Sequence, residues 1–241
     1  GENNRLVTAI SPDLGIFNAL LYGGPKSRLR SFVQTFNSGE AYLYTDSVRK
    51  SIKLSDFDLK SSHPSIRENL YKSWAASLAC EIVLKTRCAG DSESAFVLLS
   101  ALLDGIDAVD EREARLGMLR FLWRYLGLLG VQPESRQCVS CGVSLLSSEM
   151  SASYIESHNG FMCRDCIPFS SDRIRQEASL FRTDIHGLTY LAAINELSPG
   201  KVRELLLPTE SAYALKTLLY HLMERSCGTR LETLESGHGI L

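Results

Sequence analysis

The feature that most constrains this chain is a set of four cysteines in two Cys-x-x-Cys pairs, with twenty-one residues between Cys141 and Cys163. A gap of two residues lets a tight turn direct both sulfurs of a pair at one ion, and the long gap lets the chain return with a second pair. Structural zinc sites use this ligand set in tetrahedral geometry. We therefore predict one structural Zn²⁺, bound by Cys138, Cys141, Cys163 and Cys166 in a module at residues 136–168.

The residues beside the two pairs support this interpretation. Gly142 follows the first pair, where a turn around a metal needs a residue that tolerates positive φ. Asn159-Gly160 lies just before the second pair and is typical of another tight turn. Both ligand pairs are therefore expected to lie on turns.

Two alternatives to this site stay open. The pairs could form disulfides or redox dithiols, although the other three cysteines lie singly on apolar stretches, as reduced core cysteines do: Cys80, Cys88 and Cys227. His158, which is close to the second pair, could replace one cysteine as a ligand. A site filled by four protein ligands has no open position at which to activate water, so the predicted role is structural.

The composition sets further limits. With 241 residues, the chain can bury one large core or two to three small ones. Its formal net charge of −2 means that any binding of a polyanion must come from a local patch. No stretch resembles a signal peptide or a membrane span, and the pattern of cysteines fits the reducing cytosol. The start at Gly1, without a methionine, suggests that a preceding segment is missing.

Residues 1 to about 60 have the pattern of β structure. Short runs rich in β-branched and aromatic residues alternate with turn residues, which predicts strands at 6–10, 16–22, 31–36, 40–45 and 52–59. Asn37-Ser38-Gly39 has the composition of a hairpin turn between the third and fourth runs. Short strands at regular spacing favour a small barrel or sandwich.

From residue 61 the apolar period changes to that of helices. Pro64 is typical of a first helical position, and apolar residues then recur at three and four. Further helices are predicted after Gly90-Asp91, over about 111–129, over about 187–197 and from about 208 to 228. We predict an α+β protein with a β domain at 1–60 and an all-helical domain at 61–241, into which the zinc module is inserted.

Basic residues gather near the N-terminal turn that contains Gly23-Gly24. Residues 1–53 hold seven Lys and Arg against four Asp and Glu, and the cations nearest the turn are Lys26, Arg28 and Arg30. They could follow a nucleic-acid backbone, with Arg5 as a further candidate and nearby Phe or Tyr rings for stacking. The alternative is a solvated loop with core aromatics. The arginines of the third helix (Arg112, Arg115, Arg120, Arg124) likewise fit either a core rim or a phosphate site.

No catalytic constellation is recognisable. Gly23-Gly24-Pro25-Lys26-Ser27 lacks the first glycine and the spacing of a phosphate-binding loop. The five histidines are scattered, and no paired acidic motif resembles a Mg²⁺ or glycosidase site. We therefore predict a protein that is not an enzyme.

The order of these pieces resembles the bacterial RecO family of DNA repair proteins. The similar stretches run through nearly the whole chain: Asn4-Arg5-Leu6-Val7-Thr8, Leu14-Gly15-Ile16, Gly23-Gly24-Pro25-Lys26-Ser27-Arg28-Leu29, Leu126-Gly127, Pro133, Cys138-x-x-Cys141-Gly142, Gly160, Cys163-x-x-Cys166 and Leu231–Ser236. The resemblance implies an oligonucleotide-binding (OB) barrel at 1–60, whose first strand would precede this chain, followed by a helical domain that carries zinc.

The resemblance also implies a function. Members of this family are expected to bind single- and double-stranded DNA and to anneal complementary strands. They are expected to bind RecR and the tail of single-stranded DNA-binding protein, and so to help load RecA on gapped DNA. A cytoplasmic, nucleoid-associated location follows. Two rival functions stay open: a zinc-stabilised scaffold for protein interactions that does not bind DNA, and a zinc-dependent hydrolase or redox enzyme.

Overall fold

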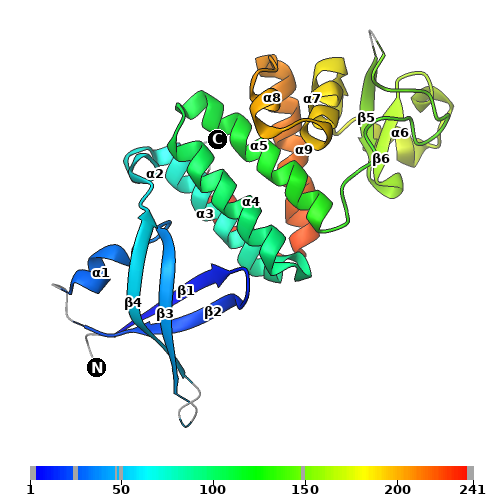
Figure 1. Ribbon diagram of the computed structural model, residues 1–241. Coiled ribbons are helices and arrows are strands. Elements are labelled where there is room, and N and C mark those ends of the chain that lie inside the picture. Colours follow the sequence, from blue (N-terminus) through cyan, green and yellow to red (C-terminus); the bar gives the residue numbers. More distant parts are fainter. Residues whose placement is uncertain (1–3, 24–26, 47, 49–50, 148–149, 238–241) are drawn as a thin grey trace. The chain divides into compact units, whose positions relative to one another are not determined.

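The computed structural model describes residues 4–23, 27–46, 48, 51–147 and 150–237 (Figure 1). The chain divides into two compact units, and each is described by itself. Unit 1 comprises Gly1–Gly117 together with Leu231–Leu241, and unit 2 comprises Met118–Arg230. The first unit is therefore built from two segments that are distant in the sequence.

The β structure of unit 1 is one four-stranded sheet in the order β1-β2-β4-β3. Its strands are β1 (Arg5–Ser11), β2 (Gly15–Leu21), β3 (Ser38–Asp46) and β4 (Ser51–Ser61). β1 pairs with β2 and β3 with β4 in antiparallel fashion, whereas β2 and β4 are parallel. β1 and β3 are the outer strands, and they do not pair among the described residues, so the predicted closed barrel is not present in this part of the chain.

One face of this sheet is covered by a short helix, α1 (Arg28–Phe32). Leu29 and Val33 are one helical turn apart, and both pack with Leu21 and Leu54 of the sheet in a small core. The prediction of a strand at 31–36, followed by a hairpin turn at 37–39, was wrong. The four-residue spacing of Leu29 and Val33 has the helical period, and it decides the local structure over the β propensity of the segment.

The remainder of unit 1 is helical. It contains α2 (Pro64–Glu68), α3 (Leu70–Lys85), the short 3₁₀ helix η1 (Arg87–Gly90), α4 (Ser92–Asp107), the start of α5 (Glu111–Leu128) and α10 (Glu232–Ser236). Side chains of Asn69 and Asp91 cap α3 and α4 by accepting from backbone N–H groups three residues on. The helix predicted from Pro64 begins there but is divided at Asn69, which has extended backbone, into α2 and α3. The helices predicted after Gly90-Asp91 and at about 111 are confirmed.

Helix α10 is attached to α3 by two side chains of α3, Trp74 and Glu81. Glu81 accepts hydrogen bonds from the backbone N–H groups of Glu232, at 2.8 Å, and Thr233, at 2.9 Å, and it pairs with Lys85 at 2.9 Å. The indole N–H of Trp74 donates to the carbonyl of Thr233 at 2.7 Å. Glu81 thus satisfies N–H groups at the start of α10 that have no partner within that helix.

Unit 2 combines helices with a second, three-stranded sheet. The end of α5, α6 (Asp172–Ala178), α7 (Ile185–Glu196), α8 (Pro199–Arg203) and α9 (Thr209–Cys227) are its α-helices, with short 3₁₀ helices η2 (Glu156–His158) and η3 (Ile167–Phe169). The sheet has the order β6-β5-β7, from β5 (Ser151–Ile155), β6 (Gly160–Cys163) and β7 (Arg182–Asp184).

This sheet corrects the prediction of an all-helical second part. β5 pairs with β6 on one side and with β7 on the other, both antiparallel. β7 lies beyond residue 168, where the zinc module was expected to end. It pairs with β5 because the hairpin partner β6 satisfies the backbone groups of only one edge of β5. In the part of the chain that the structure describes, no helix is long and apolar enough to cross a membrane.

We expect Glu81→Gln to loosen α10. Burial opposes ionisation of Glu81, but its hydrogen bonds with Lys85, Thr233 and Glu232 outweigh burial and lower its pKa. Because the folded pKa lies below the unfolded one, the carboxylate stabilises the fold fully above the ordinary pKa of glutamate, and that stabilisation disappears as pH falls through the lower value. The variant should lose about 2 kcal/mol of unfolding free energy at pH 7.

Thermal and urea unfolding at pH 7 and pH 3 would measure this loss, with exposed Glu68→Gln as the control. The difference between wild type and Glu81→Gln should shrink at pH 3. A difference of the same size at both pH values would contradict the assignment of Glu81 as a charged cap.

Candidate metal centre and nucleic-acid interface

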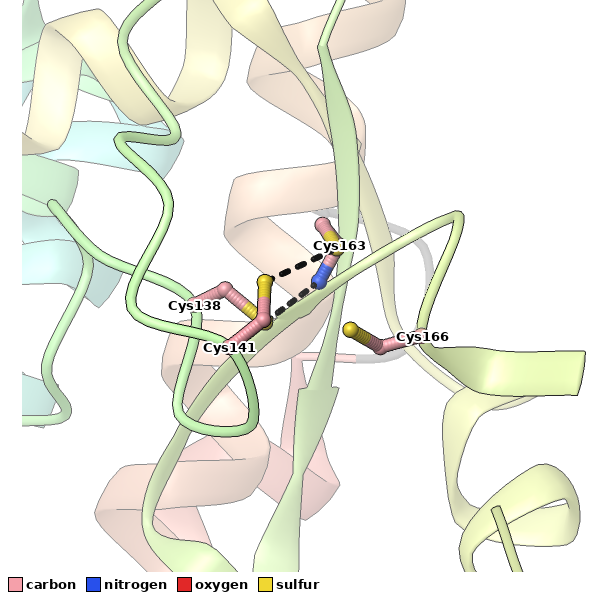
Figure 2. Close-up of side chains that lie close together, drawn as sticks. All are labelled: Cys138, Cys141, Cys163 and Cys166. Carbon is pink, nitrogen blue, oxygen red and sulfur yellow. Dashed lines mark hydrogen bonds between the residues drawn. The ribbon is translucent and has the colours of Figure 1, made fainter. Parts of the chain in front are cut away.

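The four predicted cysteine ligands meet at one point in unit 2. Their sulfur atoms all lie within 4.8 Å of one another, and Figure 2 shows the four side chains turned toward a common centre. The sulfurs of Cys141 and Cys163 are 3.9 Å apart. A tetrahedral zinc site with Zn–S bonds of about 2.3 Å requires sulfur–sulfur separations of about 3.8 Å. The ligand set and its geometry therefore fit a single zinc ion.

The first pair lies on a tight turn closed by a glycine. The N–H of Gly142 donates to the carbonyl of Cys138 at 2.9 Å, and Gly142 has φ of 72°, as predicted. The N–H of Ser140 points at the sulfur of Cys138 at 3.4 Å. A second N–H, from Cys163, reaches the same sulfur at 3.3 Å and links the two halves of the site (Figure 2).

The second pair follows the hairpin of β5 and β6. Asn159 adopts the left-handed conformation with φ of 46°, which confirms the predicted turn at Asn159-Gly160. A Cβ atom on Gly160 would lie 2.4 Å from Cγ1 of Val139, so only glycine lets the first cysteine loop lie this close to the hairpin. The backbone N–H of Val139 donates to the carbonyl of Phe161 at 2.9 Å. Two segments that are distant in sequence are thus held in contact at the site.

The thiols of the cluster have unequal acidities. Burial would raise the pKa of Cys138, but backbone N–H groups of Cys141, Cys163 and Ser140 outweigh it and lower the pKa to about 7. Burial, reinforced by hydrogen bonds with neighbouring thiols, raises the pKa of Cys163 to about 12. Burial also raises the pKa of Cys166. Four thiolates this close together would repel one another, and a dication is the group that would stabilise them.

Two alternatives to the four-cysteine site, the disulfides and a histidine ligand, have less support. All seven cysteines are free thiols in the structure. His158 lies outside the cluster, and its Nδ1 is 3.1 Å from the hydroxyl of Ser157.

The predicted DNA-contacting cations lie at several places in unit 1. Lys26 is outside the described residues. Arg28 is exposed on α1, with its guanidinium 5.4 Å from the ring centroid of Phe32. Arg30 donates to the carbonyl of Gly23 at 3.3 Å, so its side chain links α1 to the residue that follows Tyr22. Arg5 is half-buried on β1 and is paired in register with Leu21, a core residue. Of the described cations in this set, Arg28 is the most accessible to a ligand.

Three arginines of α5 have structural contacts: Arg115, Arg120 and Arg124. Arg115 stacks on the ring of Tyr71 in unit 1 at 4.0 Å and pairs with Glu111. In unit 2, Arg120 is buried and donates to the hydroxyl of Tyr190 at 2.8 Å. Arg124 donates to a backbone carbonyl, and burial lowers its pKa. These contacts favour the core-rim interpretation over a phosphate site, whereas Arg112 is exposed.

One basic feature was missed from the sequence. A surface pocket of about 300 Å³ in unit 2 has Arg164, Arg175 and Arg182 among its lining residues. Arg175 is held in place by donating to the carbonyl of Ser170 at 2.6 Å. Only Arg164 belongs to a motif that the sequence singled out, because α6 and β7, which supply the other two, were not predicted.

Comparisons with known proteins agree with the resemblance seen in the sequence. The model of a family described as "Recombination protein O C terminal" matches residues 67–235. A DNA repair protein RecO from Oceanobacillus iheyensis is 24% identical over 95% of this chain and 84% of its own length. One from an Exiguobacterium species is 29% identical over 97% and 88%, and one from Bacillus subtilis is 26% identical over 73% and 66%.

We expect Cys163→Ser to lower zinc content and stability together. Purified wild-type protein should carry about one zinc ion per chain, and the variant should carry almost none after dialysis, because three thiolates hold the ion much less tightly. Metal analysis together with thermal unfolding would measure both effects. Cys227→Ser, which removes a thiol outside the cluster, should keep its zinc. Full zinc occupancy in Cys163→Ser would refute the ligand assignment.

Proposed function

The chain belongs to the RecO family of DNA repair proteins, and from this premise we propose that it is a recombination mediator. In this proposal it binds single- and double-stranded DNA, anneals complementary strands and, with RecR, helps to load RecA on gapped DNA. The observation that carries the proposal is the family match over residues 67–235, together with relatives aligned over most of the chain.

The N-terminal sheet is proposed to be the DNA-binding part. One face of the sheet carries a small apolar core that α1 covers, an arrangement compatible with an OB-type domain at residues 1–60. Closing the sheet into a barrel would require β1 and β3 to be joined, directly or through another strand. OB domains bind a nucleic-acid strand through backbone charge and base stacking, without strong sequence preference.

The proposed DNA-backbone contacts are Lys26, Arg28 and Arg30, with Arg5 as a weaker candidate. Three of these cations lie within five residues of one another, so a local positive patch can exist on a chain whose net charge is −2. The exposed position of Arg28 supports its part in this patch.

Zinc is proposed to stabilise unit 2 without taking part in chemistry. Cys138, Cys141, Cys163 and Cys166 would fill all four positions of the ion. Residues 61–241, which belong partly to each unit and include the zinc module predicted at about 136–168 with its three-stranded sheet, are proposed to provide the surfaces for protein partners. Those expected from the family resemblance are RecR and the tail of single-stranded DNA-binding protein, with RecA affected indirectly, in the cytoplasm at the nucleoid.

A protein-interaction scaffold without direct DNA binding is the alternative. The two functions differ in salt dependence, because a protein that neutralises phosphates releases counterions and loses affinity steeply as salt rises. The absence of an enzymatic activity remains a prediction.

We expect the protein to bind a fluorescent single-stranded oligonucleotide, with an affinity that falls steeply between 50 and about 200 mM salt. The double variant Lys26→Ala/Arg28→Ala should bind roughly tenfold more weakly and should show a smaller salt slope, because two phosphate contacts are lost. Fluorescence anisotropy across a salt series measures both quantities.

A matched control is Lys201→Ala/Arg203→Ala, which removes the same charge from two exposed residues of α8 in unit 2. It should bind as the wild type does. If the two double variants lost affinity equally, the contacts would not be specific to the N-terminal patch. No wild-type binding even at low salt would instead favour the scaffold.

A further inference from the structure

The four-stranded sheet of unit 1 has a second face, which the small core does not use. Along β4, Ile52 and Leu54 both pack in that core, so Lys53 between them points to the other side of the sheet. Tyr44 of β3 is paired in register with Lys53, and its neighbour Leu43 packs in the core. Tyr44 and Lys53 therefore share the face opposite the core.

The ammonium of Lys53 is close to two exposed tyrosine rings on this face. The ammonium of Lys53 is 5.6 Å from the ring centroid of Tyr44 and 5.7 Å from that of Tyr22, the residue that follows β2. Tyr44 is 59% exposed and Tyr22 is 42% exposed. The cation–π contacts fix the two rings around one ammonium, which Asp46 also pairs at 3.7 Å, while much of the ring surface stays open to solvent.

We infer that Tyr22, Lys53 and Tyr44 form a stacking platform for the unpaired bases of single-stranded DNA. The inference rests on the proposed DNA-binding function and deepens it by naming the part of the nucleic acid that is recognised. Exposed aromatic faces attract bases of any sequence. The adjacent ammonium of Lys53 is paired with the carboxylate of Asp46 at 3.7 Å, so its part is to position the two rings, and the phosphates of the strand are left to the cations near α1. Bases paired within a duplex do not offer these faces, so the platform discriminates in favour of single strands.

A nearby tyrosine shows where the platform ends. Tyr42 is also exposed, at 46%, but its hydroxyl donates to the carboxylate of Asp58 at 3.1 Å. That hydrogen bond and the charges of Asp58, Glu40 and Asp56 raise the pKa of Tyr42. An acidic neighbourhood repels phosphate, so a DNA strand on this face should follow Tyr22 and Tyr44 and avoid Tyr42.

The platform and the proposed backbone contacts meet at the end of β2. Leu29 packs α1 on the core side, whereas Tyr44 and Lys53 lie on the opposite face. Tyr22 and Gly23 are consecutive, and the carbonyl of Gly23 accepts from Arg30 at 3.3 Å. A strand bound by α1 could therefore pass along the end of β2 to reach the rings.

The test compares Tyr44→Ala with Tyr42→Ala, an equivalent truncation on the same strand and face. With a labelled oligothymidylate, Tyr44→Ala should bind about tenfold more weakly than the wild type. Tyr44→Phe, which keeps the ring, and Tyr42→Ala should both bind as the wild type does. With an abasic oligonucleotide of the same length and charge, wild type and Tyr44→Ala should bind equally. Circular dichroism of each variant checks that the sheet is intact.

A second measurement uses Tyr44→Trp as a fluorescent reporter. Stacking should quench its emission on addition of oligothymidylate and leave it unchanged on addition of the abasic strand. Emission that instead changes with protein concentration, without DNA, would show that this face joins two copies of the chain.

The outcomes separate the platform from the proposed function. Salt-dependent binding by wild type, together with an unimpaired Tyr44→Ala or an equal loss in Tyr42→Ala, would overturn the platform alone. Absence of any DNA binding by wild type at low salt would overturn both.

Discussion

The convergence of four sulfur atoms is the constraint on which the local fold of unit 2 depends. β5 and β6 are only five and four residues long, and a hairpin of this size is marginal in water on its own. The cysteine cluster ties that hairpin to the preceding loop, and Gly160 lets the two approach closely. Burial of Tyr154 and Phe161 beside the cluster adds a small apolar core. A metal ion bound by the four cysteines would add cross-linking to the stability that this buried area supplies.

The cysteine cluster and most helices could be predicted because much of their signal is local. Two residues between cysteines describe a turn, and the turn residues Gly142 and Asn159 adopt the left-handed conformations that their identities indicate. The apolar period likewise defines α3, α4, α5 and α9 within a few residues. These features need no knowledge of the distant chain. The cluster also requires the chain to bring the second cysteine pair back to the first. The two repeated Cys-x-x-Cys spacings predicted that contact without any knowledge of the intervening fold.

The misassigned segments depend on partners that the sequence does not place. α1 is five residues long, and its helical period rests on two apolar residues, which a strand pattern fits almost equally well. β7 has three residues and is a strand only because the edge of β5 is available to it. The pairing of Tyr44 with Lys53 depends on the register of β3 and β4, which includes a bulge at Tyr42/Leu43. Such features follow from pairing, so composition alone could not give them.

The attachment of α10 to α3 has a consequence for the order in which the protein is made. A ribosome synthesises α3 long before residues 231–236, and the whole of unit 2 emerges in between. Until then Trp74 and Glu81 lack the backbone groups of α10 that they bind in the finished structure. Unit 1 can therefore reach its final state only after residues 231–236 have been synthesised, whereas unit 2 has all of its residues earlier. Chains released before that point would lack α10 and would expose the surface of α3 that it covers.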